Sequence, residues 1–270
     1  MGRGPSEPPS VVRVPPDALR ADRIAAYGHD RDTRPALEEF MADAVRFENA
    51  QTVTPLTAPS HATMLTGLFP AGHGVTKNGW RLDDANRSLP EVLSEAGYRT
   101  GGFVSVRLAL GGHLGFGQGF DEYSDGDTKR RSAPDVVDDA LAFLDGNDEA
   151  PFFLWTHFYD IHCPYRTPRT FAPTFSAGIS SGLRTIGKCD DVLVDALETD
   201  ADLELVKARY DEGIAFVDLH LERLWERLEA DGLLENTVVI VTSDHGDKLP
   251  AQGRIAHHHP RHESETHTPL

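Results

Sequence analysis

Two short apolar runs, each surrounded by helical patterns, constrain the fold of this chain more than any other feature of its sequence. The segments PFFLWTHFY (151–159) and VVIV (238–241) are almost continuously apolar, as strands are when both faces of their sheet are covered. A third strand is expected from Thr100 to Val106. Because such strands alternate with helices in largely parallel sheets, the sequence predicts an α/β fold with a largely parallel central sheet and helices on both faces.

Four segments carry apolar residues at helical spacing. The most regular is 210–228, where apolar residues step by three and four and Gly232 follows the last of them. Residues 166–203 are instead rich in Pro, Ser, Gly and Asp, and are expected to form a variable excursion from the core. The other three helices are expected within 33–47, 88–97 and 132–147.

Composition limits the domain count and the partners. A chain of 270 residues with 39% hydrophobic content can form one domain, which we expect to span 1–270. Acidic residues outnumber basic ones by 43 to 26, and the net charge of −17 argues against nucleic acid or an anionic membrane as a partner. The sequence shows neither a signal-peptide apolar core nor a membrane-spanning run, so a cytoplasmic location is expected. The acidic excess and the scarcity of lysine predict a halophilic source, and the two cysteines predict no disulfide framework.

Polar residues follow the predicted strands, where ligand sites of parallel sheets lie. Asp244-His245-Gly246 comes directly after the strand 238–241, and its carboxylate and imidazole could bind a divalent ion above a tight turn at Gly246. The alternative is a simple Asp-Gly turn. Asp17 follows the first candidate strand and could add a second carboxylate, or could cap a helix. Arg13 and two prolines, however, interrupt this strand in VVRVPPD, which disfavours a central position and predicts a displaced Asp17.

The segment LTAPSHATMLTG (56–67) reads as a short helix with a hydroxyl at its start. Thr57 would face the free N–H groups and the positive end of the helix dipole, where an anionic ester would also bind. It is either a nucleophile or, with Ser60 as the other candidate, a helix cap. Asn78 stands in an Asn-Gly turn, where it either forms the turn or donates to an anionic oxygen.

Two histidine-containing segments allow similar alternatives. In THFYDIHCPY, the pair Asp160 and His162 either holds a second metal, contacts substrate oxygens or simply forms a turn. The segment HHHPRHESETH (257–267) is either a metal-binding tract or a mobile polar tail.

Seven blocks of the chain, taken in order, resemble the sulfatase family of the alkaline phosphatase-like superfamily. The resemblance runs from about Asp17 to the last residue, weakens within 166–203, and implies that the C-terminal part of the family domain is missing. The blocks are PDALRADRIAAYGHDRDTRPALEEFMADAVRFENA, TAPSHATMLTGLFPAGHGV, GYRTGGFVS, HLGFGQGFDEY, FFLWTHFYDIHCPY, ARYDEGIAFVD and NTVVIVTSDHGD.

The resemblance implies a role for particular residues. Thr57 falls at the nucleophile, where most sulfatases place a Cys or Ser that is oxidised to formylglycine, a route closed to threonine. The family signature C-x-P-S-R appears here as TAPSH, with His61 in place of the arginine, and is closer to the T-x-P-x-H of related phosphodiesterases and pyrophosphatases. The implied metal ligands are Asp17, Thr57, Asp244 and His245; the implied substrate contacts are Asn78, His61 and His257 (or His258); and His162 is the implied acid for the leaving alcohol.

The reaction implied by the resemblance is metal-dependent hydrolysis of a sulfate ester, on a small molecule or a glycan. Thr57 would attack the ester sulfur or phosphorus, and water would cleave the covalent ester. The cofactor would be a divalent metal (calcium, zinc or manganese), with one ion favoured and two as the alternative. A phosphodiesterase or phosphonate monoester hydrolase of the same superfamily is the rival enzyme, favoured by Thr57 and His61. A catalytically impaired remnant that only binds anions is the third hypothesis, favoured by the irregular first strand and the early end.

Overall fold

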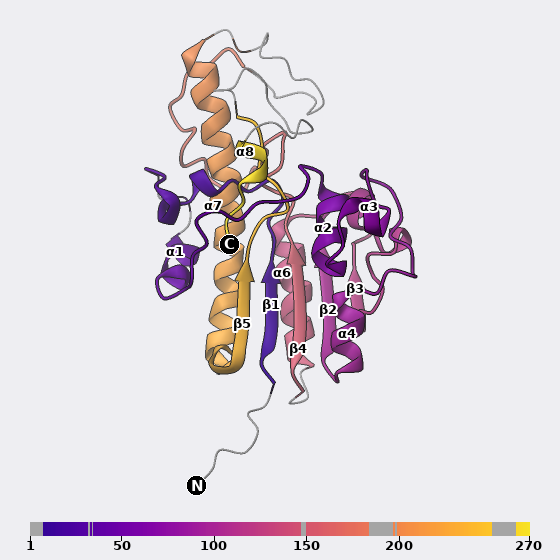
Figure 1. Ribbon diagram of the computed structural model, residues 1–270. Coiled ribbons are helices and arrows are strands. Elements are labelled where there is room, and N and C mark those ends of the chain that lie inside the picture. Colours follow the sequence, from indigo (N-terminus) through magenta and orange to yellow (C-terminus); the bar gives the residue numbers. More distant parts are fainter. Residues whose placement is uncertain are drawn as a thin grey trace.

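Five parallel strands form the centre of the structure (Figure 1). The structure is a computed structural model that describes residues 8–31, 33, 35–146, 150–183, 197, 199–249 and 263–270. The strand order is β3-β2-β4-β1-β5, and each neighbouring pair is parallel, which confirms the predicted α/β class. The strands are β1 (Ser10–Val14), β2 (Arg99–Val104), β3 (Glu122–Ser124), β4 (Phe152–His157) and β5 (Thr237–Val241).

Helices cover both faces of this sheet, as predicted. Phe152 and Leu154 of β4 belong to the apolar cluster formed with the long helices α6 and α7, whereas Phe153 and Trp155 belong to the cluster under α2, α4 and α5. Successive side chains of a strand point to opposite faces, so β4 contributes residues to the apolar clusters on both faces of the sheet. The helices are α1 (Pro35–Met41), α2 (Thr57–Thr66), α3 (Pro70–His73), α4 (Leu89–Glu95), α5 (Arg107–Leu110), α6 (Ala133–Asp145), α7 (Asp200–Ala230) and α8 (Glu263–Thr266).

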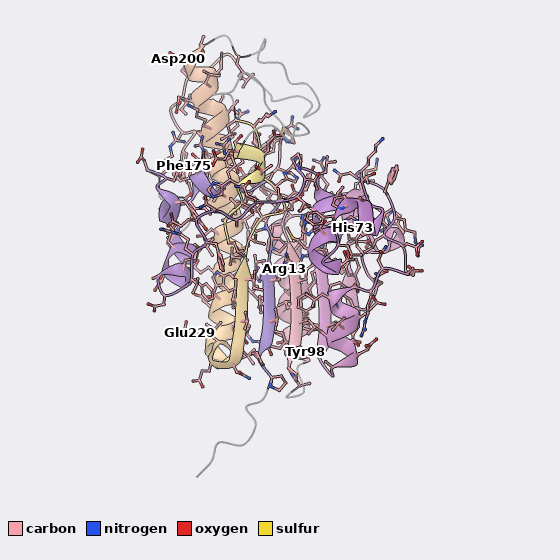
Figure 2. All side chains as sticks on the ribbon, in the orientation of Figure 1. Arg13, His73, Tyr98, Phe175, Asp200 and Glu229 are labelled. Carbon is pink, nitrogen blue, oxygen red and sulfur yellow. The ribbon has the colours of Figure 1, made fainter. Side chains whose placement is uncertain are left out.

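The expected displacement of the first strand is wrong. β1 lies between β4 and β5, and it ends at Val14, so Pro15 and Pro16 fall beyond its ladder and remove none of its hydrogen bonds. Arg13, on β1 (Figure 2), points its guanidinium to the α2 side, where Nη1 donates to the carbonyl of Met64 at 3.2 Å. The strand therefore keeps a central place despite its unusual sequence.

Two predicted helix boundaries are also wrong. The segment 33–47 is helical only as far as Met41, because α1 packs on α7 through Phe40, whose ring stacks on Trp225 at 4.5 Å, while Val45 beyond it is 80% exposed. In contrast, α7 begins at Asp200, inside the expected excursion 166–203, where a capping box of Thr199 and Asp202 starts it. The end of the expected excursion is therefore helix, and its described part 166–183 contains neither helix nor strand.

Among the described residues, no helix combines the length and the apolar composition that crossing a membrane requires.

Candidate active site

Three neighbouring strands deliver their last residues to one point at the carboxyl edge of the sheet. Asp17 comes three residues after β1, Asp244 three residues after β5, and His157 is the last residue of β4. The backbone N–H of Asp17 donates to the carbonyl of Phe158 at 2.8 Å, which ties the end of β1 to the end of β4. Asp17, Asp244 and His157 are all fully buried. Asp17 is thus in place beside Asp244, and the prolines before it do not displace it.

Thr57 does not cap the helix that it begins. Leu56 is the N-cap residue of α2 and makes no side-chain capping bond, and Thr57 is the first helical residue. The Thr57 hydroxyl donates instead to Oδ2 of Asp17 at 3.3 Å. Ser60 is not the cap either, because its hydroxyl donates to the carbonyl of Asp244 at 2.8 Å. The capping alternatives for both hydroxyls are therefore wrong, and both side chains face the site.

The carboxylate of Asp244 is oriented by the backbone. Its Oδ1 accepts from the N–H groups of Ala18 at 3.1 Å and His245 at 2.9 Å. The Nδ1 atom of His245 lies 2.8 Å from the carbonyl of Gly246, which favours the tautomer with its hydrogen on Nδ1. Nε2 of His245 then faces the carboxylates, 3.3 Å from Oδ2 of Asp244 and 3.7 Å from Oδ1 of Asp17. Asp244-His245 is therefore part of a side-chain cluster, and the simple turn is excluded.

Gly246 is required for a reason other than the expected tight turn. A Cβ at this position would lie 2.0 Å from the carbonyl oxygen of Ser264. The N–H of Gly246 also donates to the carbonyl of Glu265 at 2.9 Å. The glycine thus lets the backbone of α8 approach the site closely.

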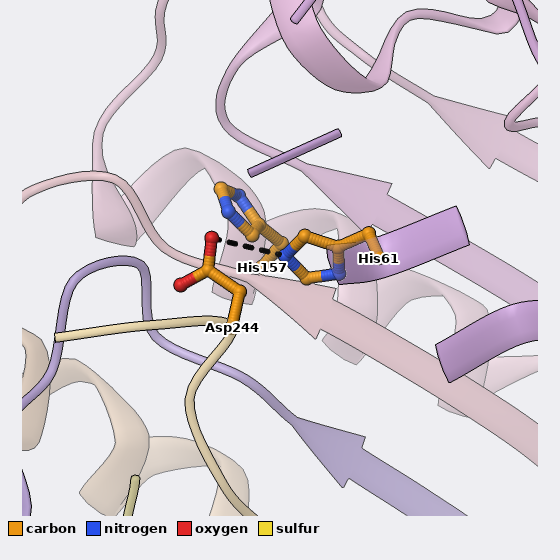
Figure 3. Close-up of side chains that lie close together, drawn as sticks. All are labelled: His61, His157 and Asp244. Atoms are coloured by element: carbon orange, nitrogen blue, oxygen red, sulfur yellow. Dashed lines mark ion pairs between the residues drawn. The ribbon is translucent and has the colours of Figure 1, made fainter. Parts of the chain in front are cut away.

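Two further imidazoles complete the cluster. His61, on α2, is 1% exposed, and its Nε2 lies 3.7 Å from Oδ2 of Asp244 (Figure 3). His157 places Nε2 3.3 Å from Oδ2 of Asp17. His157 was not among the predicted site residues, although its position at the carboxyl end of the buried strand β4 is the signal that could have found it.

Burial shifts the protonation of the whole cluster. It raises the pKa values of Asp17 and Asp244 well above their usual range; the charge of Asp17 further raises the pKa of Asp244, and that of Asp247 raises the pKa of Asp17. Burial likewise lowers the pKa of His61 well below its usual range and that of His157 to about 4. Two buried carboxylates beside neutral imidazoles are the arrangement that a bound divalent cation stabilises.

The donor atoms fit such a cation. Asp17, Asp244 and His245 each offer one ligand atom, and these three atoms lie within 4.8 Å of one another. Oδ1 of Asp17 and Oδ2 of Asp244 are buried and have no hydrogen-bond partner among the described residues. Oxygen and imidazole donors of this kind suit zinc and manganese, and carboxylate oxygens also suit calcium.

The remaining predicted residues lie around this cluster or outside the described part. Oδ1 of Asn78 accepts from the N–H of Ala58 at 2.8 Å, so Asn78 stands at the start of α2 beside Thr57. His162 stacks on Tyr159 at 4.3 Å, and its ring centroid lies 6.5 Å from that of His245. His257 and His258 lie outside the described residues.

Two further sequence alternatives concern Asp160 and the C-terminal segment. Oδ1 of Asp160 accepts from the hydroxyl of Ser132 at 2.9 Å, at the start of α6. Among the described residues, Asp160 belongs to neither group of three metal-type ligands. Of the segment 257–267, residues 257–262 lie outside the described part; the rest is not a mobile tail, because it includes α8 (Glu263–Thr266) with Glu265 buried.

A pocket of about 570 Å³ opens beside His162. The guanidinium of Arg130 lies 4.5 Å above the ring of Tyr159, which in turn stacks on His162. Three arginines line the pocket, namely Arg130, Arg131 and Arg166. Asp135 and Asp160 also line it, so the cluster has an arginine-rich recess of mixed charge at its side.

The fold and the strand-end site define a protein of the alkaline phosphatase-like class. The family model described as Sulfatase matches residues 9–270, and the chain belongs to the sulfatase family. It is 28% identical to the human N-sulphoglucosamine sulphohydrolase over 84% of this chain and 48% of that protein. It is 23% identical to an arylsulfatase of Hemicentrotus pulcherrimus over 90% of this chain and 48% of that protein. The chain spans about half the length of the curated relatives it matches.

Solved structures share the fold at low identity. An enzyme solved in complex with its substrate D-glucosamine-2-N,6-O-disulfate has a TM-score of 0.79 and 21% identity, over 98% of this chain and 70% of that chain. The phosphonate monoester hydrolase of Agrobacterium radiobacter has a TM-score of 0.76 and 21% identity, over 97% and 67%. These likenesses support the alkaline phosphatase-like fold.

Proposed function

We propose that this chain is a metal-dependent hydrolase of sulfate esters in which Thr57 attacks the ester sulfur. The observation that carries the proposal is the hydrogen bond of 3.3 Å from the Thr57 hydroxyl to Asp17, within the buried cluster of Asp244 and His245. A hydroxyl held in this way at the first residue of a helix faces the positive end of the helix dipole, where an anionic ester binds.

Each step can be assigned to a residue of the chain. Asp17 orients the Thr57 hydroxyl and, as a carboxylate, accepts its proton. The oxygen of Thr57 then forms a bond to sulfur while the bond from sulfur to the ester oxygen breaks. His162 gives a proton to the departing alkoxide, and water later cleaves the ester on Thr57. A divalent cation held by Asp17, Asp244, His245 and Thr57 would act as a Lewis acid on the developing negative charge.

Two further residues support binding of the anionic ester group. Asn78 uses its carbonyl oxygen for the N–H of Ala58, and its NH₂ group remains a donor for an ester oxygen. The organic part of the ester would occupy the pocket beside His162, which is lined by Arg130, Arg131 and Arg166. An arginine-lined pocket favours an anionic substrate, and a structural relative solved with a disulfated glucosamine supports a sulfated glycan.

Threonine itself supports a second candidate. Its secondary alcohol would oxidise to a ketone and not to the aldehyde of formylglycine, so Thr57 must react as a hydroxyl. This favours a phosphodiesterase or phosphonate monoester hydrolase as the alternative, and one structural neighbour is a phosphonate monoester hydrolase. The irregular first strand no longer argues for an impaired remnant, because β1 is intact and Asp17 reaches Thr57.

A substrate panel tests the proposal. The purified chain, supplied with Ca²⁺, Zn²⁺ or Mn²⁺ in turn, is assayed with nitrophenyl esters of sulfate, phosphate, a phosphodiester and a phosphonate. The variant Thr57→Ala should abolish the activity. The matched control Thr63→Ala should retain it, because the Thr63 hydroxyl, on the same helix, donates to the carbonyl of Pro59 and stays outside the cluster. Hydrolysis that survives Thr57→Ala would exclude Thr57 as the nucleophile, and the preferred ester decides between the two candidates.

A further inference from the structure

A second set of buried ligand atoms lies next to the first. His61, His157 and Asp244 each offer one such atom, and the three atoms lie within 4.8 Å of one another (Figure 3). Oδ2 of Asp244 is 3.7 Å from Nε2 of His61, and the rings of His61 and His157 are 4.9 Å apart. The three residues come from α2, from β4 and from the segment after β5, so the fold brings them together from distant parts of the chain.

Two of these atoms are buried without a hydrogen bond. Nε2 of His61 and Oδ2 of Asp244 have no hydrogen-bond partner among the described residues. An unsatisfied buried polar atom costs roughly 1–3 kcal/mol. His73 shows the contrast, because this buried imidazole has Nε2 3.0 Å from the Thr63 hydroxyl while its Nδ1 accepts from the N–H of Val75 at 3.1 Å. In the cluster, by contrast, two unpaired ligand atoms from different segments lie only 3.7 Å apart.

The charges of the cluster also favour the binding of cations. Within the described part of the chain, the ion-pair contacts of Asp17 and Asp244 are made by histidines, and neither carboxylate contacts a lysine or an arginine. Two fully buried carboxylates without a fixed cation are costly unless bound cations compensate them. An anionic ester would add further negative charge at the same place.

We propose that His61, His157 and Asp244 bind a second divalent cation, next to the one assigned to Asp17, Asp244 and His245. Asp244 is the shared ligand, because its Oδ2 lies between Nε2 of His61 and Nε2 of His245, at 3.7 and 3.3 Å. Two imidazole nitrogens and one carboxylate oxygen form a zinc-type donor set. Ions in paired sites are typically about 3.5–4 Å apart, a spacing that a shared carboxylate can bridge. The inference rests on the proposed function for the first site only.

Metal stoichiometry tests this inference directly. The full chain is stripped with a chelator, loaded with excess Zn²⁺, desalted, and analysed for zinc per chain by elemental analysis. Two equivalents are expected for the wild type, and one for each of His61→Gln and His157→Gln. The matched control His73→Gln should keep two, because this buried histidine lies outside the cluster. Asp17→Asn should lose the first cation and keep the second.

The outcomes separate the two sites. A wild type that binds a single equivalent, lost in Asp17→Asn and kept in His61→Gln, would overturn the second site and leave the proposed function intact. Two equivalents retained by both His61→Gln and His157→Gln would also overturn it. A chain that binds no Zn²⁺ would contradict the proposed function as well. Absorption of Co²⁺-loaded protein gives an independent readout, because removal of one imidazole ligand should change the visible spectrum, and His157→Gln reports on the site if His61→Gln does not fold.

Discussion

The hydroxyl oxygen of Thr57 lies 3.3 Å from Oδ2 of Asp17, although 40 residues separate them in the sequence. A capping threonine would instead accept a bond from a backbone N–H of its own helix. Here the N-cap residue is Leu56, and the Thr57 side chain is 2% exposed. A buried carboxylate thus fixes the position of the Thr57 hydroxyl. The stability of the helix alone does not require this contact.

This contact leads to a prediction for the isosteric variant Thr57→Val. The methyl that replaces the hydroxyl keeps the shape of the side chain but removes the nucleophile, so kcat/KM should fall by roughly 10³-fold or more on the best substrate of the panel. Thr57→Ser should keep activity within about tenfold, because it retains the hydroxyl. Steady-state kinetics of both variants provide the measurement. Equal losses in Val and Ser would indicate that packing, and not the hydroxyl, is what matters.

A pH prediction concerns Asp160. Burial raises its pKa to about 6, its Oδ1 accepts from Ser132, and its buried Oδ2 has no hydrogen-bond partner among the described residues. An unfolded Asp titrates near pH 3.9, so between about pH 4 and 6 the folded state binds more protons than the unfolded state, and stability falls as pH rises. Asp160→Asn keeps the Oδ1 acceptor and removes this loss. Its free energy of unfolding relative to wild type should rise across that window, by about 2–3 kcal/mol at pH 7.

Urea unfolding at pH 4, 5, 6 and 7 measures this difference. Because the other titrating groups are common to both proteins, their contributions cancel in the comparison. A variant whose relative stability is the same at pH 4 and pH 7 would show that the Asp160 carboxyl titrates alike in the folded and unfolded chain.

Gly246 gives a prediction about close backbone packing. An added Cβ would lie 2.0 Å from the carbonyl oxygen of Ser264, so Gly246→Ala must push α8 away from the site. Overpacking of this kind typically costs about 1–3 kcal/mol. Because His245 is the preceding residue, zinc affinity should fall together with stability. Gly182→Ala is the matched control, since a Cβ there meets no atom within 4 Å, and its melting temperature should match that of the wild type. An unchanged melting temperature for Gly246→Ala would contradict the close approach.

The sequence predicts the parts of this structure that depend on local patterns. The apolar run of β4 and the polar residues after β5 were enough to predict a parallel sheet with a site at its carboxyl edge. The site residues from separate strand ends, Asp17 and Asp244, do converge, because parallel neighbours must end at the same edge. The resemblance to the sulfatases supplied the roles that the spacing alone left open.

What the sequence could not predict depends on contacts between distant segments. The helix α1 stops at Met41 because its partner is α7, and the following chain turns to the C-terminus, where the N–H of Phe47 donates to the carbonyl of Leu270 at 2.7 Å. The position of His157 at the end of β4 marks it as a possible site residue, but its partner Asp17 follows only from the parallel pairing of β4 with β1. The sequence predicted Gly246 as a turn residue, whereas the close approach of α8 is what requires a glycine at this position.

The last prediction concerns the buried ion pair that ties α8 to the site segment. Nζ of Lys248 lies 3.1 Å from Oε2 of Glu265, with side-chain exposures of 3% and 0%. Removing one partner of a buried pair leaves a desolvated charge, so Lys248→Met should lower the free energy of unfolding by about 3–5 kcal/mol. The double variant Lys248→Met/Glu265→Leu should recover most of this loss, because neither charge of the pair is then left buried without the other.

Urea unfolding of the single and double variants gives the coupling energy of this pair. The exposed pair Arg81–Asp84, with side-chain exposures of 57% and 72%, is the matched control, and Arg81→Met should change stability by less than about 1 kcal/mol. If Lys248→Met cost no more than Arg81→Met, Glu265 would have to be either hydrated or protonated in the folded variant. A hydrated Glu265 would also argue against the close approach of α8 to Gly246, because Ser264 and Glu265 belong to the same short helix.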